Sequence, residues 1–422
     1  MKINTATKRY SEVMSLERPA HRHPGKPSFL MQTIIWAASA IDLTKTRFVF
    51  EKKHMDRAGK GPWLVLMNHS SFLDFEIATR ILWPHPFNIV ATSDGFVGRK
   101  WFMRSMGCIP TCKFIPDPHL IRDIEYAIKK NHCNVLMYPE ASYSFDGTTT
   151  QLPPGFSRLL KILDVPVVMI TAYGSFTRDP LYNNLQNRKV KASAKIECLL
   201  TVEDIRQKNI EQLDTILNKA FDLDYFRWQA ENRIATPESF RADGLDRILF
   251  RCSECDSEGQ MVGRGTELVC NACGRHFFMD EYGSLHGGSH SHIPDWYKWE
   301  REQIRKEIAN GSYCVETRVR IAMMVDMKAI YFVGNGTLRH DTSGFELSGD
   351  DGILHFTQTP KKCYSVYSDF NWYEIGDVIC IGEYGMLYYC FPETPDLVAK
   401  IRIAAEEMYR LHNRKNLMQS TL

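Results

Sequence analysis

Four cysteines near the middle of the chain have the spacing of a metal-binding site. Cys252 and Cys255 form one Cys-x2-Cys pair, and Cys270 and Cys273 form a second pair after 14 intervening residues. Zinc prefers four soft ligands in a tetrahedron, and each Cys-x2-Cys turn presents two thiolates. The sequence therefore predicts a structural zinc ion held in a ribbon over residues 247–282, with a hairpin between the two pairs.

His69 and Asp74 have the types and spacing of a general base and of the carboxylate that orients it. They closely follow the apolar run 63–67, so the histidine stands at the end of an expected strand. A carboxylate that accepts from one ring nitrogen fixes the tautomer and raises the basicity of the other nitrogen. Such a pair can take a proton from an alcohol that attacks a thioester. The spacing alone is a weak signal, because His290 and Asp295 repeat it.

The histidine belongs to a series of four short blocks. In order, the blocks are Asn68-His-Ser-Ser-Phe-Leu-Asp74, Gly107-Cys-Ile-Pro-Thr-Cys-Lys113, Tyr138-Pro-Glu-Ala-Ser142 and Val165-Pro-Val-Val168. In order and spacing they resemble the blocks of the glycerolipid acyltransferase family, which includes the lysophosphatidic acid acyltransferases. The resemblance covers roughly residues 50–205 and does not extend to the cysteine pairs or to the C-terminal region.

The resemblance implies an activity and a set of site residues. An acyl chain would pass directly from acyl-CoA or acyl carrier protein to the hydroxyl group of a lysophospholipid that resembles 1-acylglycerol 3-phosphate. His69 would act as the general base and Asp74 would orient it. Lys113, Glu140 and Ser142 would bind the acceptor. The sequence contains no Gly-x-Ser-x-Gly nucleophile elbow, which agrees with transfer without a covalent acyl-enzyme.

Two of the blocks depart from the family's pattern. Lys113 stands where arginine is usual, and lysine binds phosphate as a point charge and not through a bidentate fork. In the third block Ala141 and Ser142 replace Gly-Thr, and Tyr143 stands where arginine is common. One phosphate-binding cation is thus missing, and Arg158 is a candidate replacement. These departures leave open a different lipid acceptor, and also a membrane-associated scaffold or binding protein on an inactive acyltransferase fold.

The elements expected around these blocks alternate between strands and helices. Short apolar runs predict strands at 63–67, 87–92, 135–138 and 165–172, and helical spacing predicts helices at 73–82 and 118–130. Such alternation is typical of an α/β layer architecture, so we expect an acyltransferase-like α/β domain with a central sheet.

After residue 315 the pattern changes to a series of short strands. Asn335-Gly336 predicts a hairpin turn there, and residues 395–412 predict a closing amphipathic helix. We expect a small β-rich domain, with a PH-like fold as the favoured interpretation. The chain then divides into a basic, amphipathic, membrane-facing segment (1–50), an acyltransferase domain (51–210), a helical region that contains the zinc ribbon (211–310) and the β-rich domain (315–415).

The charge distribution bears on the partners. The 422 residues include 52 Lys and Arg against 50 Asp and Glu, a net charge of +2, so a nucleic-acid partner is not expected. Residues 1–60 contain seven Lys and five Arg against five acidic residues, a local charge of +7, which leaves −5 for the rest of the chain. A basic end beside a nearly neutral body favours an anionic membrane surface as partner.

Residues 29–41 form the most apolar stretch of the N-terminal segment, and they are too few to span a bilayer. Three interpretations remain open: a signal peptide ending near Ala38-Ser39-Ala40, a core helix, and a helix lying in the membrane interface with Trp36 at head-group level. Eight further cysteines are scattered, several of them within apolar runs, as reduced thiols usually are. We therefore expect a cytoplasmic protein, peripheral at the inner face of the membrane.

Overall fold

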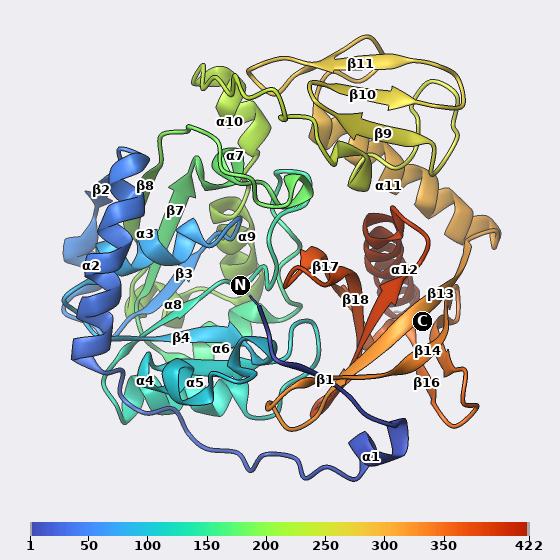
Figure 1. Ribbon diagram of the computed structural model, residues 1–422. Helices are drawn as coiled ribbons and strands as arrows, with labels where there is room; N and C mark the ends of the chain where they lie inside the picture. Colours follow the sequence, from blue (N-terminus) through green and yellow to red (C-terminus); the bar gives the residue numbers. More distant parts are fainter. Residues whose placement is uncertain (1, 420–422) are drawn as a thin grey trace.

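The computed structural model describes residues 2–419, with side chains described as far as residue 413. The strands of this part of the chain form three sheets (Figure 1). A seven-stranded sheet lies in the first half of the chain, a four-stranded sheet carries the cysteine pairs, and an eight-stranded sheet lies near the C-terminus. We call them the α/β sheet, the cysteine sheet and the C-terminal sheet.

The α/β sheet confirms the predicted α/β fold with a central sheet. In spatial order its strands are β2 (Val49–Lys53), β8 (Ser193–Leu200), β7 (Val167–Tyr173), β3 (Leu64–Met67), β6 (Asn134–Met137), β4 (Phe87–Thr92) and β5 (Cys108–Thr111). The strands from β7 to β5 are parallel, and β8 is antiparallel to β7. The central strands β3 and β6 are buried on both faces, which explains why they appear in the sequence as continuous apolar runs.

Helices cover the two faces of the α/β sheet. The helices of this part of the chain are α2 (Phe29–Lys45), α3 (Leu73–Leu82), α4 (Lys100–Ser105), α5 (Leu120–Lys129), α6 (Phe156–Leu163), α7 (Ser175–Arg178), α8 (Val202–Gln207) and α9 (Ile210–Ala220). Val65 and Met67 of β3 pack in one core with α3, whereas Leu64 and Leu66 pack in another with α5 and α6. We call residues 29–220 the α/β domain.

Helix α2 packs along α3 and is a helix of the α/β domain. Gln32 is buried and donates through Nε2 to the carbonyl oxygen of Phe87 at 2.8 Å. Trp36 stacks on Trp83 with ring centroids 4.5 Å apart. On its outer side the helix exposes four apolar side chains, those of Phe29, Leu30, Ile34 and Ile41. Among the helices of residues 2–419, none combines the length and the apolar character that a bilayer crossing requires.

Residues 5–14 of the predicted membrane-facing segment (1–50) lie against the C-terminal sheet. Strand β1 (Thr5–Thr7) pairs in parallel with the C-terminal sheet, and the short helix α1 (Tyr10–Met14) follows it. Val13 of this helix is fully buried in the core of the C-terminal half. A strand of three residues gives no periodicity that the sequence could reveal. An irregular stretch, which we call the N-terminal strap (residues 15–28), joins α1 to α2.

In the sequence, the cysteine sheet lies between two helices. Its strands, in spatial order, are β12 (Leu285–His286), β11 (His276–Met279), β10 (Glu267–Cys270) and β9 (Met261–Arg264). Helix α10 (Tyr225–Glu231) precedes the sheet, and helix α11 (Ile293–Asn310) follows it. Strands β9 and β10 form the hairpin that was predicted between the cysteine pairs.

The C-terminal sheet confirms the predicted small β-rich domain with a closing helix, and the PH-like assignment stays a prediction. In spatial order the antiparallel strands are β16 (His355–Gln358), β15 (Gly344–Gly349), β14 (Ile330–Asp341), β13 (Cys314–Met324), β19 (Met386–Pro392), β18 (Gly376–Glu383) and β17 (Tyr367–Trp372). Helix α12 (Leu397–Gln419) follows the last strand. We call residues 314–419 the C-terminal domain.

The hairpin predicted at Asn335-Gly336 is wrong. Both residues lie inside β14, which runs without interruption from residue 330 to residue 341. A Cβ atom on Gly336 would lie 2.1 Å from the carbonyl oxygen of Ser348 on the neighbouring strand. Gly334 has a φ of +137° and lies beside a bulge in the pairing with β13. The two glycines therefore permit a close strand approach and a bulge, and not a turn.

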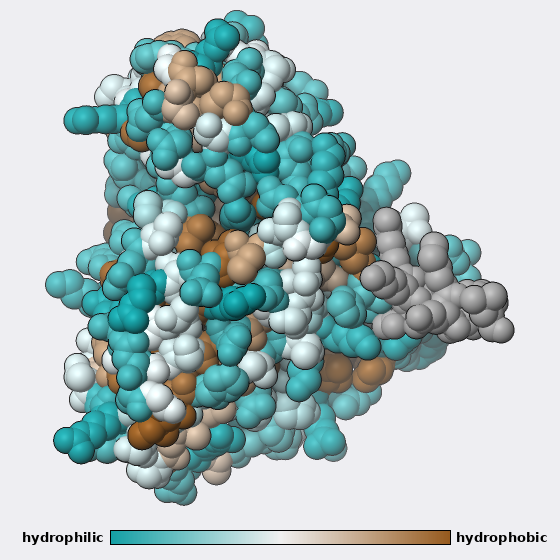
Figure 2. Space-filling model, turned by 90° about the vertical axis from the view of Figure 1, so that its right-hand side faces the viewer, coloured by the Kyte–Doolittle hydropathy of each residue, from teal (hydrophilic) through white to brown (hydrophobic). Residues whose placement is uncertain are grey.

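The C-terminal domain packs directly on the α/β domain. Cys112 and Phe114 of the α/β domain share a core with Tyr367 and Trp372 of the C-terminal sheet. The side of the molecule formed by the cysteine sheet and the C-terminal domain carries mostly hydrophilic residues, with hydrophobic ones in small scattered groups (Figure 2). The extended apolar contact of the C-terminal sheet thus faces inward, toward the α/β domain.

Candidate active site

Asn68 fixes the end of strand β3. Its side-chain Nδ2 donates to the carbonyl oxygen of Ala172 at 3.0 Å, and its Oδ1 accepts the Ala172 N–H at 2.7 Å. Because Ala172 lies on the neighbouring strand β7, this pair of bonds locks the two strand ends together. The next residue, His69, is thereby held at the carboxyl edge of the parallel sheet, where α/β folds commonly place their sites.

The structure brings His69 and Asp74 together. The Nδ1 atom of His69 lies 3.3 Å from Oδ2 of Asp74, which is fully buried. The same oxygen accepts the backbone N–H groups of Ser70 and Ser71 at 2.5 and 3.0 Å. These bonds hold the carboxylate in the first turn of α3 and aim it at the imidazole. Nδ1 therefore faces the carboxylate, which leaves Nε2 as the nitrogen available to a substrate.

Two tyrosines enclose the imidazole ring of His69. Tyr138 stacks on it at 4.0 Å between centroids, and Tyr143 meets it edge-on at 4.5 Å. Burial lowers the pKa of His69 below its usual value, and the Asp74 carboxylate opposes this shift. A neutral imidazole at neutral pH can accept a proton, as a general base must.

Glu140 lies behind His69 and is bonded to the backbone. Its Oε1 accepts the His69 N–H at 3.1 Å, and its Oε2 accepts the Thr150 N–H at 2.9 Å. Burial raises the pKa of Glu140 to about 8, although both of these hydrogen bonds oppose the rise. Both carboxylate oxygens thus bind backbone N–H groups, those of His69 and Thr150. Glu140 is not among the described residues that line the cavity beside His69.

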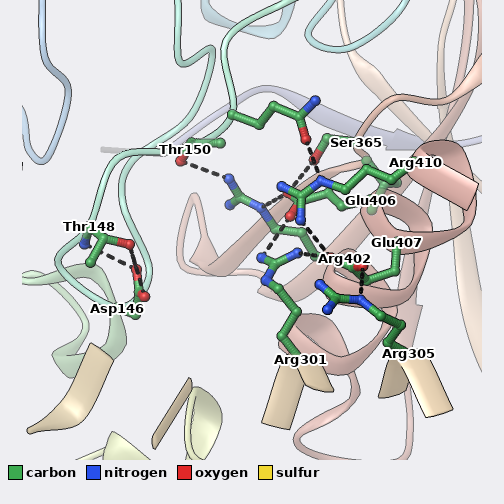
Figure 3. Close-up of polar contacts among 12 residues, drawn as sticks. Asp146, Thr148, Thr150, Arg301, Arg305, Ser365, Arg402, Glu406, Glu407 and Arg410 are labelled. Carbon is green, nitrogen blue, oxygen red and sulfur yellow. Dashed lines mark hydrogen bonds and ion pairs between the residues drawn. The ribbon is translucent and has the colours of Figure 1, made fainter. Parts of the chain in front are cut away.

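Ser142 is also buried behind the cavity wall, and its partner comes from the far end of the chain. Arg402 of α12 donates through Nη2 to Ser142 Oγ at 2.8 Å. The same Nη2 donates to Thr150 Oγ1 at 3.1 Å (Figure 3). The guanidinium also lies 4.3 Å from the ring centroid of Phe145 and contacts Glu406 Oε1 at 3.4 Å. The sequence holds no signal for this contact, because Arg402 stands 260 residues from Ser142 in a region outside the four blocks.

Lys113 lines the cavity beside His69 and lies under the C-terminal sheet. Its Nζ atom is 4.3 Å from the ring centroid of Tyr367. Burial lowers the pKa of Lys113, and the carboxylates of Asp94 and Asp369 oppose this shift. Asp94 in turn accepts from the Tyr367 hydroxyl at 3.0 Å and from Trp372 Nε1 at 3.2 Å. The C-terminal domain therefore supplies both an aromatic partner and a carboxylate next to the predicted phosphate-binding cation.

A cavity of about 1670 Å³ opens beside His69, between the α/β domain and the C-terminal domain. Polar groups that the α/β domain contributes to its wall include His69, Arg99, Lys113, Asp117 and Arg158. The C-terminal domain contributes a group of aromatic residues, namely Tyr364, Tyr367, Trp372, Tyr373, Tyr384 and Tyr409. Four apolar residues both line the cavity and are exposed to solvent, Phe72, Phe102, Ile121 and Ile162. The cavity wall thus combines cationic and acidic side chains with an aromatic group from the C-terminal domain, and part of its apolar lining is exposed to solvent.

The four predicted zinc ligands converge at one end of the cysteine sheet. The Sγ atoms of Cys252 and Cys273 are 3.9 Å apart, and those of Cys255 and Cys270 are 3.7 Å apart. All four lie within 4.8 Å of one another and could hold a metal ion. Tetrahedral Zn–S bonds of about 2.3 Å place sulfur atoms about 3.8 Å apart, so the observed spacing fits a four-thiolate metal site.

Comparisons with known proteins agree with the family resemblance of the four blocks. A family model described as Acyltransferase matches residues 47–171. Among solved structures, the chain is similar to the crystal structure of the 1-acyl-sn-glycerophosphate (LPA) acyltransferase PlsC from Thermotoga maritima, at 15% sequence identity and a TM-score of 0.34. That match covers 45% of this chain and 76% of the other. No curated protein matches the chain.

Proposed function

We propose, from the match of residues 47–171 to the Acyltransferase family model, that the protein transfers a fatty acyl chain to the hydroxyl group of a lysophospholipid. The proposed donor is a thioester, acyl-CoA or acyl carrier protein. The single observation that carries the proposal is the position of His69, which contacts Asp74 through Nδ1 and lines a large cavity.

In the proposed reaction, Nε2 of His69 takes the proton from the acceptor hydroxyl. The oxygen attacks the carbonyl carbon of the thioester, so that the C–O bond of the product ester forms and the C–S bond breaks. The leaving thiolate then takes the proton from His69, which restores the neutral imidazole. Asp74 holds the Nδ1 proton and stabilises the imidazolium that forms in between.

Lys113 and Arg158 are the proposed partners of the acceptor's phosphate. Both line the cavity, and each carries a cation that can form a charge-assisted hydrogen bond with a phosphate oxygen. Arg158 would thus replace the phosphate-binding arginine that is common in the third block, where this chain has Tyr143. The aromatic wall from the C-terminal domain would contact the apolar chains of the substrates.

We propose further that the protein acts at an anionic membrane surface on the cytoplasmic side. The exposed apolar residues Phe72 and Phe102 stand at the mouth of the cavity, and the neighbouring Trp101 has 77% of its surface exposed. Apolar residues at the mouth would let lipid substrates enter without crossing water. The outer side of α2 exposes Phe29 and Ile34, which would form a second apolar contact with the membrane.

The proposed occupant of the four-cysteine site is a structural zinc ion. The four thiolates leave no open position for a substrate, which fits a structural role. Cys252 and Cys270 belong to the same core as Trp296 of α11 and Val398 of α12. Zinc bound there would stabilise the cysteine sheet and, through this shared core, the C-terminal domain that completes the cavity.

Purified protein incubated with acyl-CoA and a panel of lysolipids tests the proposed function. Thiol release that depends on one of the lysolipids is the expected result. The absence of thiol release with every acceptor, in detergent and on vesicles, would overturn the proposal. It would favour the scaffold or binding protein on an inactive fold.

A further inference from the structure

A second group of metal-ligand side chains lies on the α/β domain, far in sequence from the cysteines. His21 Nε2 is 3.0 Å from both carboxylate oxygens of Asp123, and His23 Nδ1 is 2.9 Å from Oδ1. The ligand atoms of these three residues all lie within 4.8 Å of one another. The histidines come from the N-terminal strap, and Asp123 lies in the first turns of α5.

The strap is held in place by contacts that do not involve the histidine rings. Asn131 donates to the carbonyl oxygen of Pro24 at 3.0 Å, and Asn88 donates to that of Gly25 at 3.0 Å. Arg104 donates to the carbonyl oxygen of Arg22, also at 3.0 Å. The backbone between residues 22 and 25 is therefore fixed on the α/β domain. Because of this, binding of an ion by the histidines would not require the strap to become ordered first.

The two imidazole rings are oriented by helix α5 as well. His21 stacks on His119 with centroids 4.1 Å apart, and His23 stacks on Tyr126 at 4.5 Å. His119 at the N-cap of α5 and Tyr126 within it lie on the same face of the helix as Asp123. The rings thus present their nitrogens to the carboxylate in a preorganised geometry, which lowers the entropy cost of binding an ion.

The carboxylate of Asp123 is buried, so its negative charge needs a cation or hydrogen-bond donors nearby. Its side chain is 3% exposed, and within residues 2–419 the two imidazoles are its hydrogen-bond partners. Two imidazole nitrogens and one carboxylate oxygen form a donor set that suits zinc and other divalent transition metals. With metal–ligand bonds of about 2.0–2.1 Å, tetrahedral ligands stand about 3.3 Å apart, so an expansion of a few tenths of an ångström would admit the ion.

We propose that His21, His23 and Asp123 bind one divalent transition metal ion, with water at the remaining position. The histidine side chains are 27% and 49% exposed, so an ion can enter from solvent. The bound ion fastens the N-terminal strap to α5. Because Leu120 and Ile121 at the start of α5 line the large cavity, the ion also steadies one wall of that cavity.

Zinc content measured on the full chain, after metal removal, reloading with zinc and gel filtration, tests this site independently of acyl transfer. Wild-type protein is expected to retain two zinc ions per chain, one at the cysteines and one at the histidines. The double variant His21→Ala/His23→Ala, which changes exposed side chains, is expected to retain one. His355→Ala is the matched control and keeps two, because that exposed histidine pairs with a single carboxylate, Glu346.

Reloading with cobalt in place of zinc identifies the ligands at each site. Thiolate ligands give strong charge-transfer absorption, whereas a site of two histidines and an aspartate gives weaker bands without it. The double variant is expected to lose the weaker bands and keep the thiolate absorption. Zinc or cobalt binding that is identical in wild type and in the double variant would overturn the proposal, and the two histidines would then serve as hydrogen-bond donors to Asp123.

Discussion

Arg402 of helix α12 donates a 2.8 Å hydrogen bond to Ser142 of the third acyltransferase block, across 260 positions of the sequence. The same guanidinium bonds Thr150, whose N–H is held by Glu140 behind His69. A chain of direct contacts therefore links the closing helix of the C-terminal domain to the loop that carries the predicted base. The C-terminal domain therefore contacts the candidate active site directly and is not a separate appendage.

Arg402→Ala is expected to destabilise the fold and to lower activity. The change leaves Ser142 and Thr150 without a donor and leaves the buried Glu406 with one cation fewer. Removal of one partner from a buried ion pair costs about 3–5 kcal/mol, which thermal or urea unfolding can measure. Arg339→Ala is the control, because this exposed arginine pairs with Asp341 on the surface. The control should change stability by about 1 kcal/mol or less. Equal effects of the two substitutions would contradict the role given to Arg402.

Lys113→Ala is expected to raise the KM for a phosphate-bearing acceptor. Loss of a charge-assisted hydrogen bond costs about 1.5–3 kcal/mol, which corresponds to a rise of roughly 10- to 100-fold in KM. The measurement is acyl transfer to lysophosphatidate and to a monoacylglycerol in parallel. The neutral acceptor lacks the phosphate, so its KM should change little. A similar loss with both acceptors would show that Lys113 does not recognise the phosphate.

Glu140→Gln separates a structural role from the acceptor-binding role that the resemblance implied. Glutamine has one carbonyl oxygen where Glu140 uses two carboxylate oxygens, so one backbone N–H, that of His69 or Thr150, loses its acceptor. We expect a loss of about 1–3 kcal/mol in unfolding free energy and a fall in kcat. Glu140 is not among the described residues that line the cavity, so the KM for the acceptor should stay nearly constant. A large rise in that KM with unchanged stability would contradict this placement.

The pH dependence of kcat/KM follows from the pKa of His69. Burial lowers this pKa below 6.5, and the base must be neutral to take a proton. Activity should therefore persist as the pH falls through 6.5 and decline only at a lower pH, where the imidazole becomes protonated. The check is a pH profile in which donor and acceptor are shown to stay intact. An acid limb with its midpoint well above pH 6.5 would argue against His69 as the base.

Much of the α/β domain could be predicted because its signals are local. The buried strands β3 and β7 are continuous apolar runs, and His69 and Asp74 stand five residues apart in one strand-to-helix turn. The cysteine pairs behave in the same way, because each pair of ligands comes from one short turn. In such cases the spacing in the sequence nearly determines the spacing in the structure.

Other parts of the site could not be predicted, because they depend on which surfaces meet. Tyr367, Asp369 and Arg402 reach Lys113 and Ser142 through the packing of the C-terminal sheet on the α/β domain. The hairpin prediction at Gly336 failed because glycine is favoured both in turns and where two strands approach closely, and the sequence does not distinguish the two. His21 and His23 gave no pattern, since their partner Asp123 lies about 100 residues away.

The most direct test of the account compares wild type with His69→Ala in acyl transfer from isotopically labelled acyl-CoA to lysolipid in vesicles, with the product lipid measured by mass spectrometry. Circular dichroism and thermal unfolding first establish that the variant is folded. The account predicts labelled product with wild type and a loss of about 10²–10⁴-fold or more in the variant, the usual contribution of a general base. Product formation by folded His69→Ala at the wild-type rate would contradict the central claim that His69 is the base.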